Sequence, residues 1–286
     1  MRPEPHPPPP ATSLPLGPRS ASWRIIREPA VIAGGAGRAL LLQVSHPAVA
    51  AGVEQHSDYR ADPWGRLFRT LDTMLKLAFA PPAVGQRKAD LLARRHAVVH
   101  GRTDDGVAYD ARDPELLLWV WATLVDSSVL AYRSGVGPLP PAVADRFVQE
   151  QQLVARACGL PAGLAPERAS DLRRLVDEVV ARDLRATATA RTVAGQILRP
   201  PVPWPLQRVA GAGNALVTTA LLPAELRAPL GLPWDARRAR TAAVAFRAAR
   251  AGAALTPRRL RHAPVAHLVR RPRPISARRS PGPTAA

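Results

Sequence analysis

Apolar residues recur at every third or fourth position along most of the chain, the spacing that buries one face of an α-helix. An acidic cap followed by proline opens each of two helices, predicted over 63–79 and 114–132. A third helix is predicted over 84–100, with Gly101 as its stop signal. No stretch alternates apolar and polar residues over any length, so little or no β-strand is expected. The pattern therefore predicts an all-α fold.

The two ends of the chain lack this helical pattern. Residues 1–22 are rich in Pro, Ser and Ala, and residues 264–286 mix Arg, Pro and Ser, so both segments are expected to be disordered. A single multi-helix globular domain is expected over 23–263. Its remaining helices are predicted over 141–158, twice within 166–199, and over 206–220, 223–229 and 235–253.

The formal net charge of +18 is typical of proteins that bind nucleic acid, but its distribution changes that interpretation. No Asp or Glu follows Asp235, and residues 236–286 hold 13 Arg, which leaves +5 for residues 1–235. The basic charge therefore belongs to the C-terminal part of the chain. Contact of 258–286 with nucleic acid or an anionic membrane is an alternative; a tail that only maintains solubility is the preferred interpretation.

Cysteine content and hydropathy favour a cytoplasmic protein. Cys158 is the single cysteine, so no intrachain disulfide can form. The first residues lack the apolar segment of a signal peptide. The longest apolar run, 116–130, is interrupted by Asp126 and two serines, which predicts a buried core helix.

His96 is the first candidate for chemistry. On the predicted helix it shares an apolar stripe with Leu92 and Val99, where a neutral imidazole could offer a lone pair to a metal. Spacing alone favours a core histidine bonded to a backbone carbonyl. His100 lies one turn later and could join His96 on one metal, but a cation in the last turn of a helix also suits the helix dipole.

Arg66, Arg69 and Thr70 form a second candidate cluster on one face of the helix 63–79. Arginines on a largely buried helix need anionic partners. A protein carboxylate such as Asp126 would serve, and so would the propionates of a haem; the residues alone favour the carboxylate.

Three further features have simpler interpretations. His46 precedes Pro47 at an expected helix break, and His56 is expected in a polar loop. The Gly34-Gly35-Ala36-Gly37 stretch follows no strand and lacks the frame of a phosphate-binding loop, so it is expected to allow close helix packing.

Taken in order, these motifs resemble the family that contains the MpaB oxygenase and the rubber oxygenases (latex-clearing proteins). The resemblance covers about 25–235, and it rests on the ordered set rather than on one motif. The matching stretches are Arg27-Glu28-Pro29, Gly34 to Gln43, His46-Pro47, Gly52-Val53, His56-Ser57, Arg66 to Thr70, His96-x-x-Val99-x-Gly101, Tyr109-x-Ala111-x-Asp113-Pro114 and Trp119.

The resemblance implies an all-α fold that holds one haem b, with His96 as the iron ligand and Arg66, Arg69 and Thr70 beside the haem. It implies an oxygenase that uses O2 on an apolar small molecule, with unsaturated compounds among the candidates, and an unknown redox partner. Glu54 is then the nearest candidate base. The rubber-oxygenase branch has Lys at the position of Arg69, and a guanidinium cannot replace an amine as an iron ligand at neutral pH. A non-catalytic haem-binding protein is the alternative.

Overall fold

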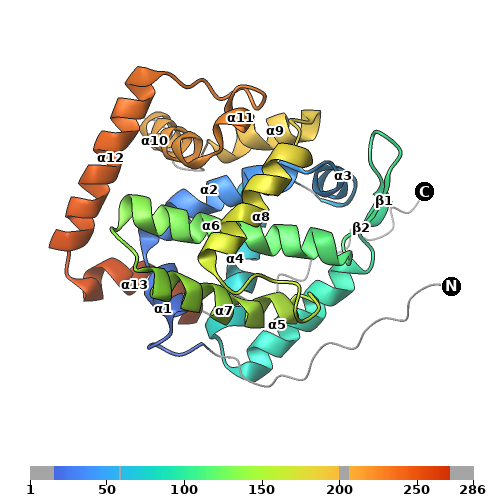
Figure 1. The fold of residues 1–286 in the computed structure, drawn as a ribbon, viewed down its shortest axis with the longest axis horizontal. Helices are drawn as coiled ribbons and strands as arrows, with labels where there is room; N and C mark the ends of the chain where they lie inside the picture. The colour runs from blue at the N-terminus through green and yellow to red at the C-terminus, as the bar shows by residue number, and fades with distance from the viewer. Residues whose placement is uncertain (1–15, 58, 200–205, 271–286) are drawn as a thin grey trace, which may run out of the picture.

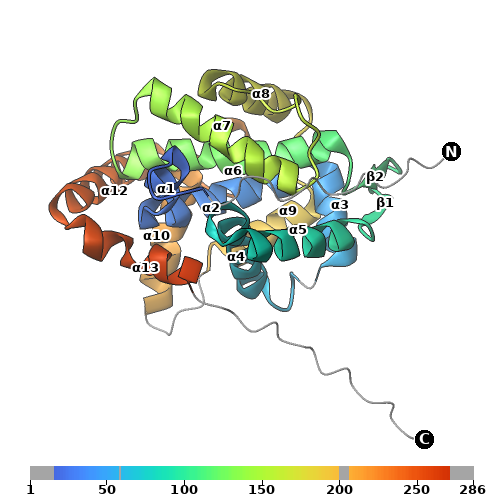
Figure 2. The same cartoon turned by 90° about the horizontal axis from the view of Figure 1, so that it is seen from below.

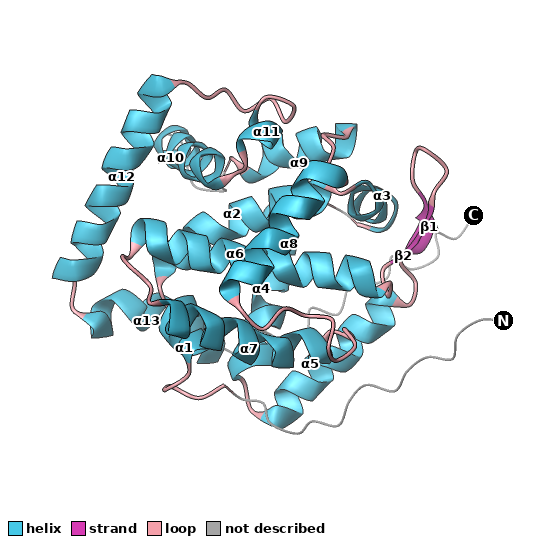
Figure 3. Ribbon diagram, viewed as in Figure 1, coloured by secondary structure: helices cyan, strands magenta, loops and turns pink. Residues whose placement is uncertain are grey.

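The computed structural model describes residues 16–57, 59–199 and 206–270, and all of its long elements are helices (Figures 1 and 3). Two three-residue strands form the one short hairpin in this part of the chain. The all-α prediction is confirmed. In chain order, the elements are α1 (Ala21–Ile26), α2 (Pro29–Ser45), α3 (Pro47–His56), α4 (Pro63–Phe79), α5 (Pro82–His96), β1 (His100–Arg102), β2 (Ala108–Asp110), α6 (Pro114–Gly135), α7 (Pro141–Ala157), α8 (Ala169–Arg182), α9 (Ala188–Ile197), α10 (Leu206–Leu221), α11 (Ala224–Arg227), α12 (Ala236–Leu255) and α13 (Arg258–Arg270).

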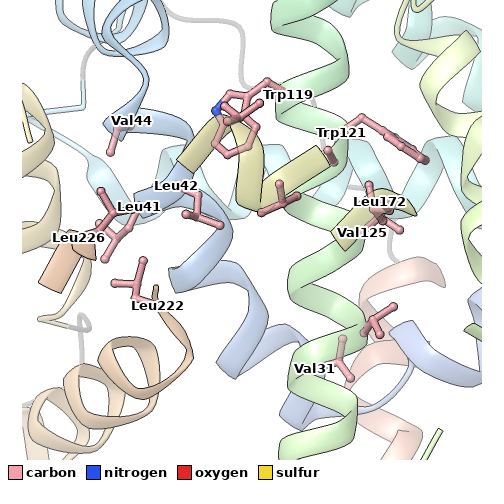
Figure 4. Close-up of a cluster of buried hydrophobic side chains, with 14 of the residues drawn as sticks. Val31, Leu41, Leu42, Val44, Trp119, Trp121, Val125, Leu172, Leu222 and Leu226 are labelled. Carbon is pink, nitrogen blue, oxygen red and sulfur yellow. The ribbon is translucent and has the colours of Figure 1, made fainter. Parts of the chain in front are cut away.

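Helices α2 and α6 form the centre of the fold. In Figure 2, α6 crosses the middle of the molecule, with α7 and α8 above it and α2, α4 and α9 below it. The buried side chains of this centre include Leu41, Leu42, Trp121 and Val125 (Figure 4). Because both central helices are covered on several sides, their apolar residues surround the helix instead of following one stripe.

A glycine seam lets α2 approach its neighbours closely. A Cβ atom at Gly35 would lie 3.3 Å from the backbone oxygen of Ser127 on α6. A Cβ at Gly37 would lie 2.5 Å from Oγ1 of Thr218 on α10. The interpretation of the Gly34–Gly37 stretch as a packing feature is therefore confirmed.

A buried ion pair joins the same three helices. Arg38 is fully buried, and its Nη2 lies 2.7 Å from Oδ2 of Asp126. Its Nε donates to the backbone oxygen of Leu221 (2.8 Å) and its Nη1 to the hydroxyl of Ser127 (2.7 Å). Asp126 was expected to pair with an arginine on α4. That expectation is wrong, because Arg38 on the neighbouring helix α2 binds its carboxylate.

Among the described helices, α6 alone has the length and apolar composition to span a membrane, and 56% of its most apolar window is buried inside the protein. This helix also carries Asp126, which is buried in an ion pair with Arg38 of α2, as expected for a helix in a protein core. The core-helix interpretation of 116–130 is thus confirmed by its packing.

The predicted helix over 84–100 is shorter than expected. Helix α5 ends at His96, and the chain then enters the β1–β2 hairpin, in which Gly101 pairs with Tyr109. The hairpin contacts α3, because the Tyr109 hydroxyl donates to Oε1 of Gln55 (2.8 Å). This tertiary contact, which local sequence does not encode, draws the last predicted turn out of the helix.

The expected disordered ends also need correction where they are described. Helix α1 begins at Ala21, inside the segment expected to be disordered over 1–22, and α13 continues through the expected boundary at 264. Both helices are anchored to the domain: Ala21 donates its backbone N–H to Glu150 (3.1 Å), and Arg261 pairs with Glu28 (2.9 Å). The expectation of disorder for 1–15 and 271–286 lies outside the described residues.

Candidate functional site

Helices α4 and α5 form an antiparallel hairpin that carries most of the candidate site. Two residues, Ala80 and Pro81, connect the helices, and the Nζ atom of Lys88 lies 2.8 Å from Oδ2 of Asp72, so the second helix folds back along the first. The start of α4 and the end of α5 therefore lie at the same open end of the hairpin. Arg66 and His96, 15 residues to either side of Pro81, both belong to this end.

His96 ends α5 as a half-buried side chain. Burial lowers the pKa of its imidazole below the ordinary value of 6.5, and the distant Asp110 carboxylate opposes this only in part. Within the described residues, the ring makes no hydrogen bond and no ion pair. The imidazole is consequently neutral at pH 7 and has a free lone pair, as an iron ligand requires.

Arg66 is the second unpaired group at this end. Its side chain is half-buried, and burial, together with the charge of Arg69, lowers the pKa of its guanidinium. No carboxylate in the described part of the chain pairs with it. A half-buried cation without a counter-ion is costly, and it is the feature expected where an anionic group binds.

Arg69 and Thr70 are placed differently. The Nη1 atom of Arg69 lies 2.9 Å from Oδ2 of Asp62, and both side chains are more than half exposed. The Thr70 hydroxyl is exposed and donates to the backbone oxygen of Arg66 (3.1 Å). Both residues share the helix with Arg66, as the sequence predicts, but their polar groups already have partners inside the protein.

Glu54 lies on α3 within a separate hydrogen-bond cluster. Its carboxylate accepts from the hydroxyl of Tyr59, from Arg60 (2.7 Å) and from Thr189 on α9 (3.1 Å). These bonds, led by that from Tyr59, hold the pKa of Glu54 below its ordinary value, which makes the carboxylate a weaker base. Its neighbour Gln55 instead contacts the β1–β2 hairpin that follows His96. Among the described residues, no hydrogen bond or ion pair joins Glu54 to His96 or to Arg66.

The other histidines do not join His96 in a cluster. His100 is exposed in β1, and its backbone oxygen lies 3.1 Å from Nε2 of His56 at the end of α3. His46 caps the break between α2 and α3, and its Nδ1 is buried without a hydrogen-bond partner in the described structure. No group of three or more potential metal ligands occurs among the described residues. The two-histidine chelate considered for His96 and His100 is not formed, because the helix ends between them.

The Glu54 partners show what the sequence could not reveal. Thr189 is 135 positions from Glu54, and no local motif links them. Asp62 was recognised as a helix cap, but its second role as the partner of Arg69 was not. The spacing of seven residues, two helical turns, is a signal that could have found that pair.

Comparison with known proteins supplies the family. The sequence profile described as "ER-bound oxygenase mpaB/B'/Rubber oxygenase, catalytic domain" matches residues 23–251. The chain belongs to this family. Its members are similar to it over nearly the whole helical domain, so this mpaB/rubber oxygenase family protein contains an oxygenase-type catalytic domain, and the resemblance drawn from the ordered motifs is confirmed.

Two curated relatives are similar to this family member. Uncharacterized proteins of Mycobacterium bovis (Mb2261) and Mycobacterium tuberculosis (Rv2237) are each 28% identical to it over 214 residues, covering 68% of this chain and 78% of the relative. No solved structure gives a significant match to the chain.

The open end of the α4–α5 hairpin suits a haem group. A haem b needs one axial nitrogen from the protein and cationic partners for its propionates. His96 offers an unprotonated nitrogen without another partner, and Arg66 offers a guanidinium without a counter-ion. A single histidine is sufficient for this role, so a cluster of ligands is not required.

Proposed function

We propose that this family member is a haem b-dependent oxygenase, in which His96 holds the iron and Arg66 pairs with a haem propionate. The observation that carries the proposal is the pair of unpartnered nitrogen groups at one end of the α4–α5 hairpin. Membership of an oxygenase family makes a catalytic rather than a purely structural role the better explanation of that pair.

Each residue has a defined task in this proposal. His96 stays unprotonated because the protein desolvates it, so its lone pair is available for iron at neutral pH. Arg66 neutralises a carboxylate and fixes its orientation through a planar, two-pronged guanidinium. Haem b, when bound, supplies a redox-active iron for O2 chemistry. Arg69, tied to Asp62, adds positive potential beside Arg66 rather than a direct bond.

The expected substrate is an apolar small molecule, as the resemblance to the rubber oxygenases implies. Trp64 and Phe68 lie one helical turn apart on α4, with ring centroids 6.0 Å apart, on the face of the helix that points away from Arg66. Phe68 remains 39% exposed, so part of its ring is available for an apolar partner. Apolar lining with few polar groups is typical of pockets that bind such molecules. Glu54, held in its own cluster, acts in this scheme only as a distant candidate base.

Haem titration tests the cofactor assignment. The full chain should bind one equivalent of haem and give a Soret absorption band. Arg66→Gln should weaken haem binding at least tenfold, because a charge-assisted hydrogen bond is worth about 1.5–3 kcal/mol. Arg87→Gln, which removes an exposed arginine from the same hairpin far from its open end, is the matched control and should bind as the wild type does. Equal loss in the two variants would reject the role of Arg66.

Catalysis is tested separately from binding. With a chemical reductant in place of the unknown redox partner, the haem-loaded protein should consume O2 faster when an unsaturated apolar compound is present. A haem spectrum that no apolar compound perturbs, together with unchanged O2 consumption, would support the non-catalytic haem-binding alternative instead.

A further inference from the structure

A second site is formed by residues outside the α4–α5 hairpin, where side chains of α1 and α13 line one cavity. A cavity of about 460 Å³ opens between α1, the ends of α6 and α7, and α13. None of its lining residues belongs to α3, α4 or α5. In Figure 1, α13 and α1 overlap at the lower left, and residues of both helices line the cavity. Six arginines line the cavity: Arg19, Arg24, Arg27, Arg146, Arg258 and Arg261.

The protein itself neutralises little of this charge. Glu28 is the one acidic lining residue, and its carboxylate is already bound by Arg261 (2.9 Å) and by Nε2 of His262 (2.9 Å). Arg146 is paired with Glu150 outside the lining (3.2 Å). The other four arginines form no ion pair with any residue of the described structure. Six arginine side chains therefore line a cavity whose single carboxylate, that of Glu28, is already paired.

Arg27 shows that the arrangement is under electrostatic strain. Its Nε is buried and has no hydrogen-bond partner among the described residues. Burial lowers the pKa of its guanidinium, and the nearby charges of Arg258 and Arg261 lower it further, although Glu28 opposes them. A buried donor left without an acceptor is unfavourable, and a bound acceptor would remove that cost.

The terminal segments offer few acidic groups to fill the cavity. Residues 1–15 contain one, Glu4, and residues 271–286 contain none but add further arginines. The counter-charge for the four unpaired arginines is therefore best supplied by another molecule. Arginine recognises phosphate oxygens through two parallel hydrogen bonds, and the cavity volume is in the range of small-molecule sites.

We propose that this arginine-lined cavity binds a phosphate-bearing small molecule, with Arg24, Arg27 and Arg258 as its principal contacts. The convergence of these arginines on one pocket favours a compact, multiply charged anion such as a diphosphate group over an extended nucleic-acid backbone. The family match ends at 251, before α13 begins, so two of the six lining arginines, Arg258 and Arg261, come from a helix outside the family domain. The ligand would thus join this helix to the catalytic domain. The site is independent of haem.

Calorimetric titration of the full chain with pyrophosphate and with inorganic phosphate tests the proposal. One equivalent of pyrophosphate should bind, more tightly than phosphate. Arg24→Gln and Arg258→Gln should each weaken it at least tenfold, since each removes charge-assisted bonds from an exposed side chain with no structural partner. Arg240→Gln, an equally exposed arginine on α12 outside the cavity, is the matched control and should change the affinity less than twofold. Circular dichroism should give the same melting temperature for all three variants without ligand.

Three outcomes would overturn the site: no saturable binding, several equivalents bound per chain, or equal weakening by Arg240→Gln, which would indicate general attraction to a basic protein. A sedimentation assay identifies the source of the phosphate. Vesicles of phosphatidylcholine with phosphatidic acid should sediment the wild type and not Arg258→Gln if the ligand is a lipid headgroup. Failure of both proteins to sediment, with pyrophosphate binding intact, assigns the site to a soluble ligand.

Discussion

The buried pair Arg38–Asp126 gives the sharpest prediction about stability. Asp126→Asn keeps the shape of the side chain but removes its charge, which leaves the fully buried Arg38 guanidinium without a counter-ion. Removal of one partner from a buried ion pair costs about 3–5 kcal/mol, because the remaining charge is desolvated and unpaired. Arg38 keeps two neutral acceptors, Leu221 and Ser127, so the lower end of that range applies. For a domain of this size, about 3 kcal/mol lowers the melting temperature by roughly 6–12 °C.

Urea denaturation followed by circular dichroism measures this effect. The matched control is Arg173→Gln, because Arg173 also approaches Asp126, at 3.5 Å, but its side chain is 43% exposed. An exposed pair contributes at most about 1 kcal/mol, so this variant should be close to the wild type. The double variant Arg38→Met with Asp126→Leu should recover part of the loss, since an apolar pair of similar volume carries no unpaired charge. A loss below about 1 kcal/mol for Asp126→Asn would refute the description of a dehydrated pair that ties three helices together.

Three further predictions follow from close contacts and from burial. Gly37→Ala should lower the free energy of unfolding by about 1–3 kcal/mol, because the new Cβ would lie 2.5 Å from the hydroxyl of buried Thr218. The control is Gly213→Ala on α10, where a Cβ would meet no atom within 4 Å. This variant should be neutral or slightly stabilising in the same urea assay. Burial raises the pKa of the Cys158 thiol to about 12, and the side chain is only partly exposed, so a thiol-specific chromogenic reagent at pH 8 should label it more slowly in the native protein than in urea; equal rates would contradict the raised pKa. Burial lowers the pKa of His96 in the folded protein below the unfolded value of 6.5. The neutral imidazole therefore makes its full contribution to stability above pH 6.5, and this contribution is lost as the pH falls toward the folded pKa. Between pH 7.5 and 5.5 the haem-free wild type should lose more stability than His96→Gln, and equal losses would contradict the lowered pKa.

Much of the fold could be predicted because its helix boundaries are encoded locally. Asp62 accepts from the backbone N–H of Gly65, and Asp113 accepts from that of Glu115, as the cap-and-proline signals before α4 and α6 predict. The end of α5 could not be predicted in this way. Its final residues lack a strong helix breaker before Gly101, and the actual stop depends on the hairpin's contact with Gln55 on α3.

The ends of the domain show the same limit. Segment 258–270 reads as a basic tail because its composition is rich in arginine, yet Glu28, more than 230 positions away, pairs with Arg261 and His262 and holds α13 in place. The sequence predicted the candidate site only as a set of residue types. In the structure, Arg66 and His96 lack partners. Arg69 is paired with Asp62, and Glu54 accepts from Tyr59, Arg60 and Thr189.

Haem binding by two histidine variants is the most direct test of the central claim. His96→Ala should abolish stoichiometric haem binding, because it removes the desolvated, neutral nitrogen at the open end of the α4–α5 hairpin. His100→Ala, four positions later but exposed in β1, should keep one equivalent of haem and the wild-type Soret band. Circular dichroism should show both variants folded. A folded His96→Ala protein that still binds one equivalent of haem with the wild-type spectrum would contradict the assignment of His96 as the iron ligand.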